Sequence, residues 1–423
     1  MRVSNKSLQS TLFFIPVLGM AYMLSQFLRS SPAVLAPELI RDLSLDPVDI
    51  GTISGTFFLV FAAIQLPVGV FLDRYGPRRV MSILVLFAAL GSFLFAQADN
   101  FWGLSIGRGL MGAGCAAMLM GSFVVFSRWF PKDRFASYAA VISSIGNTGI
   151  LLATLPLAAT VEAVGWRQSF VGVGVYALLV SALLYGFLRD HPDRNYHANL
   201  PRESLLEGFA SIRLIIRDRA LWPMVPLLFV SYSSVAALTT LWAGTYLADV
   251  QMMEAIDRGE ILLAMGVGAV IGPMMLGHLD RVFDTRKGVV VVGTLVRILL
   301  LFALFIWVDP HKWVAVSIFV MLAFSIGYAA ILMAHARSLF HDHLIGRGMS
   351  VVNSLIMGGV AVTQFLTGLV MDVALHITGD TEQAYRFVFL FLAAVLGAAL
   401  LVYLRAEDCK PSAQRDPGRG VID

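Results

Sequence analysis

Residues 69–79 read Gly69-Val70-Phe71-Leu72-Asp73-Arg74-Tyr75-Gly76-Pro77-Arg78-Arg79, and a related run, Leu279-Asp280-Arg281-Val282-Phe283-Asp284-Thr285-Arg286-Lys287, begins 207 residues after Leu72. A second pair of runs, Arg128-Trp129-Phe130-Pro131 and Arg337-Ser338-Leu339-Phe340, is separated by 209 residues. Each run closes a long apolar stretch. Two matches at nearly the same offset indicate that the chain is a duplicated unit.

The composition is that of a polytopic membrane protein. Of the 423 residues, 58% are hydrophobic and 14% are charged, and the mean hydropathy is +0.77. A soluble chain of this length could not bury so much apolar surface. The net charge of +3 says little about partners, and the two cysteines, Cys115 and Cys409, predict neither a disulfide framework nor a metal site.

Apolar stretches of spanning length divide six and six around one long hydrophilic interval, residues 189–221. The predicted fold is therefore an all-α membrane protein with twelve transmembrane helices in two pseudo-symmetric six-helix bundles. The expected domains are a first bundle (1–188), a cytoplasmic linker (189–221), a second bundle (222–408) and a flexible cytoplasmic tail (409–423). The predicted spans are 11–37, 50–72, 79–97, 101–126, 136–160, 167–188, 222–248, 260–280, 288–308, 313–337, 348–375 and 385–405.

The linker contains apolar residues that repeat at a regular spacing. Leu205, Phe209, Ile212 and Ile216 recur at helical spacing among arginines, a pattern that favours an amphipathic helix on the anionic inner leaflet. The alternative is a simple tether between the halves.

The basic residues predict the orientation. With the N-terminus inside, the cytoplasmic loops and tails hold 23 of the 31 lysines and arginines. The positive-inside rule then places both termini in the cytoplasm. The short polar segment 1–10 runs into the first span without a small-residue cleavage site, so this span is expected to be retained in the inner membrane.

Arg29 is a charge inside the first predicted span. It precedes Pro37, near the end of that span, by eight residues, which places it roughly 12 Å below the end of a helix. An ionised side chain at that depth costs several kcal/mol unless it faces a water-filled cavity or a partner. Arg29 is therefore a candidate functional residue, and the duplicated membrane architecture favours a transporter.

The run 69–79 resembles the loop signature of the major facilitator superfamily, commonly GxLaDrxGrrr, and the resemblance extends over the whole chain. It implies alternating access by two bundles that rock about a central site. It also implies that the loop after the second span and its repeat after the eighth act as a conformational latch on the cytoplasmic side. The latch residues would be Gly69, Asp73, Arg74, Gly76, Arg78, Arg79, Asp280 and Arg281.

Arg108, in Gly107-Arg108-Gly109, resembles the arginine motif of the family's fourth span. It lies seven residues after Phe101, at a depth similar to that of Arg29. Two cations in one cavity of low dielectric attract an anion, so the pair is a plausible carboxylate clamp. The corresponding positions of the second half, near Leu238 and Ser317, are uncharged, which predicts an asymmetric site.

Arg29 followed by Ala36-Pro37 resembles the anion:cation symporter branch of this superfamily, which carries sugar acids and other organic anions. The branch typically has a carboxylate before this arginine and often another about seven positions after the fourth-span arginine. Here these positions are Leu28 and Cys115. Proton coupling through those carboxylates is not predicted. H⁺ could be coupled through His335, coupling could be absent, or a counter-anion could be exchanged.

Further polar side chains complete the predicted substrate pocket. Gln65, Asn147 and Gln364 could contact substrate hydroxyls or join helices to one another. Tyr232, Trp242 and Tyr246 of the seventh span could line the pocket, although Trp242 and Tyr246 equally suit the membrane interface. Arg297 is expected to snorkel toward the cytoplasm, and His335, near the end of the tenth span, to be partly solvated.

Three rival interpretations remain open. The chain could carry neutral or cationic compounds, although the fifth span lacks the Gly-Pro pair typical of drug antiporters. It could carry a metal chelate such as iron with an organic acid, or it could be a sensor of the same fold that transports nothing. No catalytic constellation, cofactor motif, metal site or nucleic-acid-binding pattern is present in the sequence. The family resemblance implies a monomer in the lipid bilayer.

Overall fold

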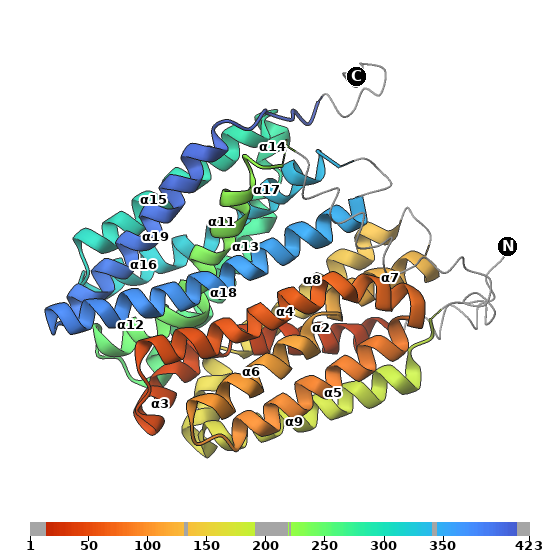
Figure 1. Ribbon diagram of the computed structural model, residues 1–423, viewed down its shortest axis with the longest axis horizontal. Coiled ribbons are helices and arrows are strands. Elements are labelled where there is room, and N and C mark those ends of the chain that lie inside the picture. The colour runs from red at the N-terminus through yellow and green to blue at the C-terminus, as the bar shows by residue number, and fades with distance from the viewer. Residues whose placement is uncertain (1–13, 131–133, 191–218, 220, 341–344, 413–423) are drawn as a thin grey trace. The chain divides into compact units, whose positions relative to one another are not determined.

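The computed structural model describes residues 14–130, 134–190, 219, 221–340 and 345–412 (Figure 1). Every regular element in these ranges is a helix. The chain divides into two compact units, Met1–Leu45 with Thr56–Ala210, and Asp46–Gly55 with Ser211–Asp423. The amphipathic segment expected in the linker, the end of the tail and the side chain of Asp73 lie outside the described part.

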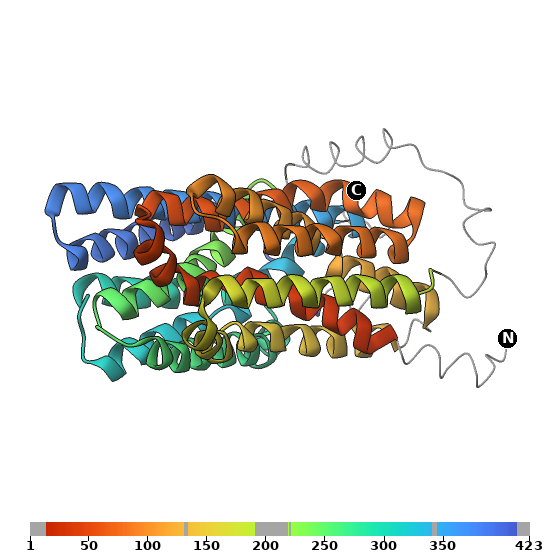
Figure 2. The ribbon, with the colours of Figure 1, turned by 90° about the horizontal axis from the view of Figure 1, so that it is seen from below.

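In the first unit, α5 packs along both α6 and α9, and α2 packs along α8 (Figures 1 and 2). The first turns of α4 group with the second unit. The helices of this part of the chain are α2 (Phe14–Ser30), α3 (Pro32–Leu43), α4 (Pro47–Tyr75), α5 (Pro77–Ala96), α6 (Phe101–Cys115), α7 (Met118–Trp129), α8 (Phe135–Leu152) and α9 (Leu155–Phe187).

In the second unit, α11 packs against α18, α15 against α19, and α13 against α16. One turn of this unit, η3, is π-helical. The helices are α11 (Val225–Ala237), η3 (Leu238–Trp242), α12 (Ala243–Asp249), α13 (Ala255–Leu276), α14 (Leu279–Val282), α15 (Arg286–Ile306), α16 (Lys312–Phe324), α17 (Gly327–Arg337), α18 (Ile345–Thr378) and α19 (Thr381–Tyr403).

Two of the helix breaks in the first unit have counterparts in the second unit. Helices α2 and α3 are separated at Ser31, and the π-helical turn between α11 and α12 begins at Leu238, 207 residues later. Helices α6 and α7 separate after Cys115, and α16 and α17 separate after Phe324, 209 residues later. These are the offsets of the two sequence matches. The duplication therefore includes the helix breaks, which in membrane transporters free backbone groups near a site.

Ten helical segments of the described residues are long and apolar enough to cross a membrane. The two predicted spans outside this set are 11–37, which is broken at Ser31, and 136–160, which is broken between α8 and α9. Within the described residues, α2 has 17 residues, and Ser137–Leu152 of α8 is an apolar helix shorter than the other ten. Gly165, with φ 82°, divides α9 into two helices, and the second corresponds to the predicted span 167–188.

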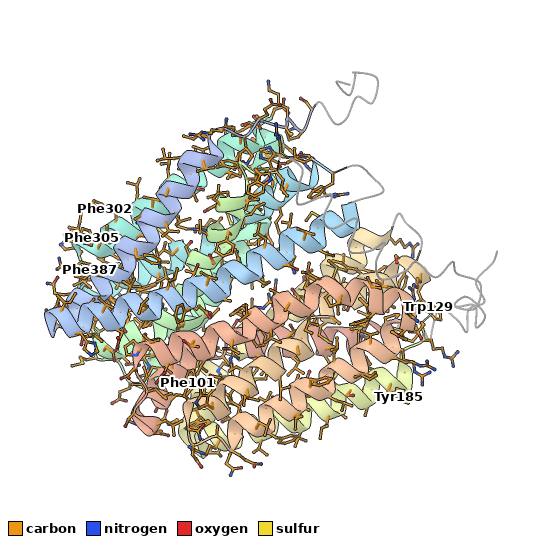
Figure 3. All side chains as sticks on the ribbon, viewed as in Figure 1. Phe101, Trp129, Tyr185, Phe302, Phe305 and Phe387 are labelled. Atoms are coloured by element: carbon orange, nitrogen blue, oxygen red, sulfur yellow. The ribbon has the colours of Figure 1, made fainter. Side chains whose placement is uncertain are left out.

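Aromatic side chains mark the two ends of the first unit. Trp129 and Tyr185 lie at one end and Phe101 lies at the other (Figure 3). Between them, the glycines of the run 107–114 allow close packing of helices. A Cβ at Gly112 would meet the backbone of Phe57, and one at Gly114 would meet that of Ala88. The absence of a side chain at these positions therefore permits the close approach of the helices.

Candidate functional site

Arg29 occupies the last turn of α2, where the helix dipole favours a cation. The helix ends there because Pro32 cannot continue its hydrogen-bond ladder, and Ser31 Oγ donates to the Leu28 carbonyl at 3.2 Å. The guanidinium lies over the Phe61 ring, 4.9 Å from the centroid. Its Nε is buried without a hydrogen-bond partner. The Phe61 ring therefore positions the Arg29 guanidinium, and its Nε–H donor has no acceptor.

Arg108 is 1% exposed and lies in the middle of α6. Its Nη1 donates to the carbonyl of Leu28 at 2.7 Å, and its guanidinium lies 4.6 Å from the centroid of the Phe57 ring. Its Nε and Nη2 are buried without a hydrogen-bond partner. A buried cation with two unmade hydrogen bonds is costly unless a ligand supplies the acceptors.

The two arginines lie in one neighbourhood. Arg108 binds the carbonyl of the residue before Arg29, and their ring partners, Phe57 and Phe61, are one turn apart on α4 with centroids 6.2 Å apart. Among the described residues, neither guanidinium has a carboxylate partner. Two uncompensated cations that share a buried region attract an anion, and planar guanidinium groups match the geometry of a carboxylate.

Three further side chains of the first unit lie beside this pair. Cys115 of α6 hydrogen-bonds with the Ser25 side chain and lies close enough to both arginines to interact electrostatically. Gln65 is 2% exposed, follows Phe61 by one turn of α4, and has a buried Oε1 without a partner. The α4 face whose Phe57 and Phe61 rings contact the two arginines therefore continues to a polar side chain, Gln65, with an unused acceptor.

Gln26 was not predicted from the sequence as a site residue. Its Nε2 donates to Asn147 Oδ1 at 3.2 Å, while its own Oε1 is buried without a partner. The signal was its position three residues before Arg29, which puts both on one face of α2. Asn147 thus joins α2 to α8, and Gln26 presents the free acceptor.

The predicted pocket residues of the second unit use most of their polar groups internally. Trp242 Nε1 donates to Thr367 Oγ1 at 2.8 Å, and the Tyr246 hydroxyl donates to the Val308 carbonyl at 2.6 Å. Both side chains are buried, at 2% and 0% exposure. Gln364 donates to Thr240 Oγ1 at 2.9 Å but keeps a free Oε1, and Tyr232 is partly exposed.

Arg297 does not snorkel toward a helix end, as the sequence suggested. Its side chain is fully buried in the second unit. Nε donates to Ser325 Oγ at 2.9 Å, Nη2 donates to the Ser325 carbonyl at 2.8 Å, and Nη1 donates to the Ser231 carbonyl. The guanidinium also lies 4.3 Å from the centroid of the Tyr328 ring. Ser325 lies in the break between α16 and α17, where its carbonyl accepts from Arg297 and, at 3.3 Å, from the Tyr328 backbone N–H.

His335 was expected to be partly solvated, and this expectation is wrong. The ring is fully buried, with Nδ1 2.8 Å from the Tyr403 hydroxyl and Nε2 2.9 Å from the Glu407 carbonyl oxygen. Because a carbonyl only accepts, Nε2 carries a proton. His335 therefore ties the end of α17 to the segment after α19. Arg337, by contrast, is exposed at the end of α17.

The loop between α4 and α5 is bound to the end of α9. Gly76 has φ 81°, a conformation that suits glycine, and a Cβ there would meet the Asp190 carboxylate. Asp190 Oδ1 accepts from the Arg78 backbone N–H at 2.7 Å, and Arg78 Nε donates to the Tyr185 carbonyl at 2.7 Å. Gly69, Arg74 and Arg79 are exposed.

The second unit repeats this arrangement. Asp408, beyond α19, accepts from the backbone N–H groups of Arg286 and Lys287 at 3.1 and 3.0 Å, and from Thr285 Oγ1 at 2.5 Å. Asp280 is buried and pairs with Arg286 at 3.4 Å, whereas Arg281 is exposed. In each unit, an acid beyond the last helix therefore binds the N-terminus of the helix that follows the signature loop.

Asp408→Ala should destabilise the second unit by about 1 kcal/mol, as expected for the loss of a helix cap. Partial burial opposes its ionisation, but hydrogen bonds from Thr285, Lys287 and Arg286 hold the pKa of the Asp408 carboxyl below its usual value. Its contribution is therefore complete above the unfolded-state pKa, about 3.9, and is lost as the pH falls through the lower folded-state value. Thermal unfolding of the purified protein at several pH values tests this.

Glu407→Ala is the matched control, because Glu407 is the neighbouring exposed acid and contributes only its carbonyl to His335. It should leave the unfolding temperature unchanged at every pH. Equal effects of the two substitutions would contradict the capping role.

The comparisons with known proteins cover nearly the whole chain. The sequence profile of the Major Facilitator Superfamily matches residues 18–279 and 259–420. A protein of Escherichia coli described as a probable L-galactonate transporter is 24% identical over 421 residues, which cover 94% of this chain and 89% of that protein. A probable sulfoacetate transporter of Cupriavidus necator, SauU, is 21% identical over 402 residues, 92% of each chain.

A solved structure shares the fold. The bacterial homologue of the human lysosomal transporter Spinster, in an inward-facing and occupied conformation, aligns with a TM-score of 0.73 at 18% identity, over 93% of this chain and 96% of that one. Duplicated units of membrane-crossing helices with repeated breaks define a multi-pass membrane transporter. The chain belongs to the Major Facilitator Superfamily.

Proposed function

We propose that this protein is a secondary transporter of a small organic anion, and that Arg29 and Arg108 bind the anion. The observation that carries the proposal is the pair of guanidinium groups without a carboxylate partner among the described residues, with Nε of both and Nη2 of Arg108 unbound. The relatives described as L-galactonate and sulfoacetate transporters support an anionic substrate.

The remaining site residues take different roles in this proposal. Gln26, Gln65 and Gln364, each with a free buried Oε1, would accept from substrate hydroxyls. Asn147 would hold Gln26 in place. Tyr232 would remain available to the substrate, whereas Trp242 and Tyr246, whose donors are used internally, would support the π-helical turn η3. This turn is where the second unit would move, because π-helical turns occur at functional breaks.

The wider architecture of the proposal follows the sequence. We place twelve spans in two six-helix bundles, with both termini in the cytoplasm and a monomer in the inner membrane. The two signature loops, held by Asp190 with Arg78 and by Asp280 with Arg286, would form the cytoplasmic latch. Alternating access would expose the arginine pair to each side in turn.

Leu28 stands where related carriers place a carboxylate, and its contribution here is a carbonyl that accepts from Arg108. Cys115 stands at the second such position. Within the described part of the chain, the site therefore carries two cationic charges without a counter-charge. On this basis a dianion should bind more tightly than the matching monoanion. The negative charge of the substrate would neutralise the two arginines, as a carboxylate of the protein does in related carriers.

A thermal-shift screen of the purified protein tests the proposal. The panel should hold sugar acids and other organic acids as monoanions and dianions, together with neutral sugars, cationic drugs and ferric citrate. We expect stabilisation of the wild type by an anion, most strongly by a dianion, and no shift in Arg29→Ala. Stabilisation by neutral or cationic compounds alone would contradict the proposal, and a shift by ferric citrate but not citrate would indicate a chelate.

A further inference from the structure

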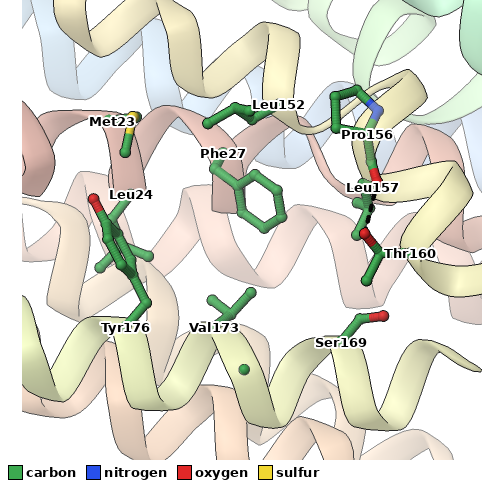
Figure 4. Close-up of a pocket in the computed structure, with 11 residues that line it drawn as sticks. Met23, Leu24, Phe27, Leu152, Pro156, Leu157, Thr160, Ser169, Val173 and Tyr176 are labelled. Carbon is green, nitrogen blue, oxygen red and sulfur yellow. Dashed lines mark hydrogen bonds between the residues drawn. The ribbon is translucent and has the colours of Figure 1, made fainter. Parts of the chain in front are cut away.

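A cavity of about 320 Å³ opens in the first unit between α2, α8 and α9 (Figure 4). Met23 and Phe27 of α2 form one wall, and Tyr176 of α9 lies opposite. Leu152 and Pro156, on either side of the break between α8 and α9, close the third side. The volume is within the roughly 300–1,000 Å³ of small-molecule sites.

The cavity offers no free hydrogen-bond donor from its hydroxyl groups. Thr160 donates to the Pro156 carbonyl at 2.7 Å, Ser169 to the Gly165 carbonyl at 2.8 Å, and Tyr176 to the Met20 carbonyl at 3.3 Å. The other lining side chains are apolar, and none of the residues that line it is charged. A polar ligand would lose its hydration there without compensation, so the matching ligand is apolar.

The depth of the cavity places it among acyl chains. Its residues on the second part of α9 run from Ser169 to Tyr176, four to eleven residues after the helix begins again at Gly165, or roughly 6–16 Å along the axis. Its other α9 residues, Pro156, Leu157 and Thr160, precede Gly165. Half of the hydrocarbon core is about 15 Å thick. Leu152, which lines the cavity, is 41% exposed, and Val175, next to Tyr176 in the sequence, is 57% exposed. The cavity therefore borders an exposed apolar surface of the kind that faces acyl chains.

We propose that this cavity binds one acyl chain of a membrane phospholipid. The acyl chain is the apolar molecule that surrounds such a surface at high concentration, and the opening gives it direct entry from the bilayer. Once bound, it would pack against Met23 and Phe27, within two turns of Arg29 on the same helix. The lipid would thus support the helix that carries the anion-binding arginine.

Photo-crosslinking in proteoliposomes tests the proposal. A small fraction of the phosphatidylethanolamine would carry a diazirine within one acyl chain, and labelled peptides would be located by mass spectrometry. We expect label on Met23, Phe27 and Leu152 in excess of label on Leu178 and Leu179, two exposed residues of α9 outside the cavity. Label confined to those exposed residues would mean that only bulk lipid is present, and would overturn the proposal.

Gly172→Leu provides the second arm, because Gly172 lines the cavity and a Cβ there meets no atom within 4 Å. The leucine should fill the space and reduce label on the α2 wall to background. Gly186→Leu is the control, since Gly186 is on the same helix, is equally open, and lies outside the cavity. Undiminished α2 label in Gly172→Leu would contradict the proposal. If that variant does not accumulate, the positions of the label in the wild-type protein test the proposal by themselves.

Discussion

Arg29→Gln is expected to abolish concentrative uptake of the organic anion while the protein still inserts and folds. Among the described residues, the side chain makes no hydrogen bond that the fold would lose, since its Nε is unpartnered and its guanidinium lies over the Phe61 ring. A charged hydrogen bond is worth about 1.5–3 kcal/mol, which corresponds to a roughly 10- to 100-fold loss in affinity. Binding to purified protein and uptake into cells measure the two effects.

Arg29→Lys should fail nearly as completely, because an ammonium group lacks the planar fork that binds a carboxylate through two donors. Arg41→Gln is the matched control, since Arg41 is a neighbouring arginine on α3 that is exposed and paired with Glu38. It should transport normally. Wild-type affinity in Arg29→Gln would show that Arg29 does not bind the anion. Unfolded Arg29→Gln protein would show that the arginine has a structural role.

Arg297→Gln, unlike Arg29→Gln, should cause a large loss of stability. Substitution leaves two carbonyl groups and the Ser325 hydroxyl without the guanidinium that binds them inside the second unit. Breaking a buried charged network of this kind costs roughly 3–5 kcal/mol. We expect a lower unfolding temperature and a lower yield of monodisperse protein in detergent.

Arg405→Gln controls for the loss of a charge, because Arg405 is exposed just beyond α19. It should leave the unfolding temperature unchanged. An Arg297→Gln protein as stable as the wild type, with reduced transport, would instead place Arg297 in the transport mechanism.

The sequence predicted the features that depend on local order along the chain. The offsets of 207 and 209 residues anticipated the repeated unit, and the helix breaks recur at the same offsets. The prediction of Arg29 and Arg108 as neighbours combined their similar depth along two spans with the resemblance to the family, whose fold places both helices along one cavity. The sequence predicted twelve spans, and the described residues contain ten helical segments long enough to cross a membrane. The other two predicted spans are divided by breaks at Ser31 and between α8 and α9.

The sequence did not predict features that arise from packing between distant segments. Arg29, Arg108 and Arg297 look alike as lone arginines in apolar spans, yet Arg297 binds the carbonyls of Ser231 and Ser325, and the other two keep unused donors. No local pattern marks Phe57 and Phe61 as ring partners of arginines. The caps formed by Asp190 and Asp408 depend on where the chain returns after the last helix of each unit.

The central claim is that the carboxylate of the substrate is what the protein recognises. The most direct test is uptake into proteoliposomes of a labelled sugar acid and of the sugar alcohol that differs from it only at that carboxylate. Galactonate with galactitol, and galactarate as the dianion, form a suitable set. The account predicts saturable uptake of an acid, none of galactitol, and none of either in Arg29→Gln. Equal uptake of acid and sugar alcohol, or uptake of the acid that survives Arg29→Gln, would contradict it.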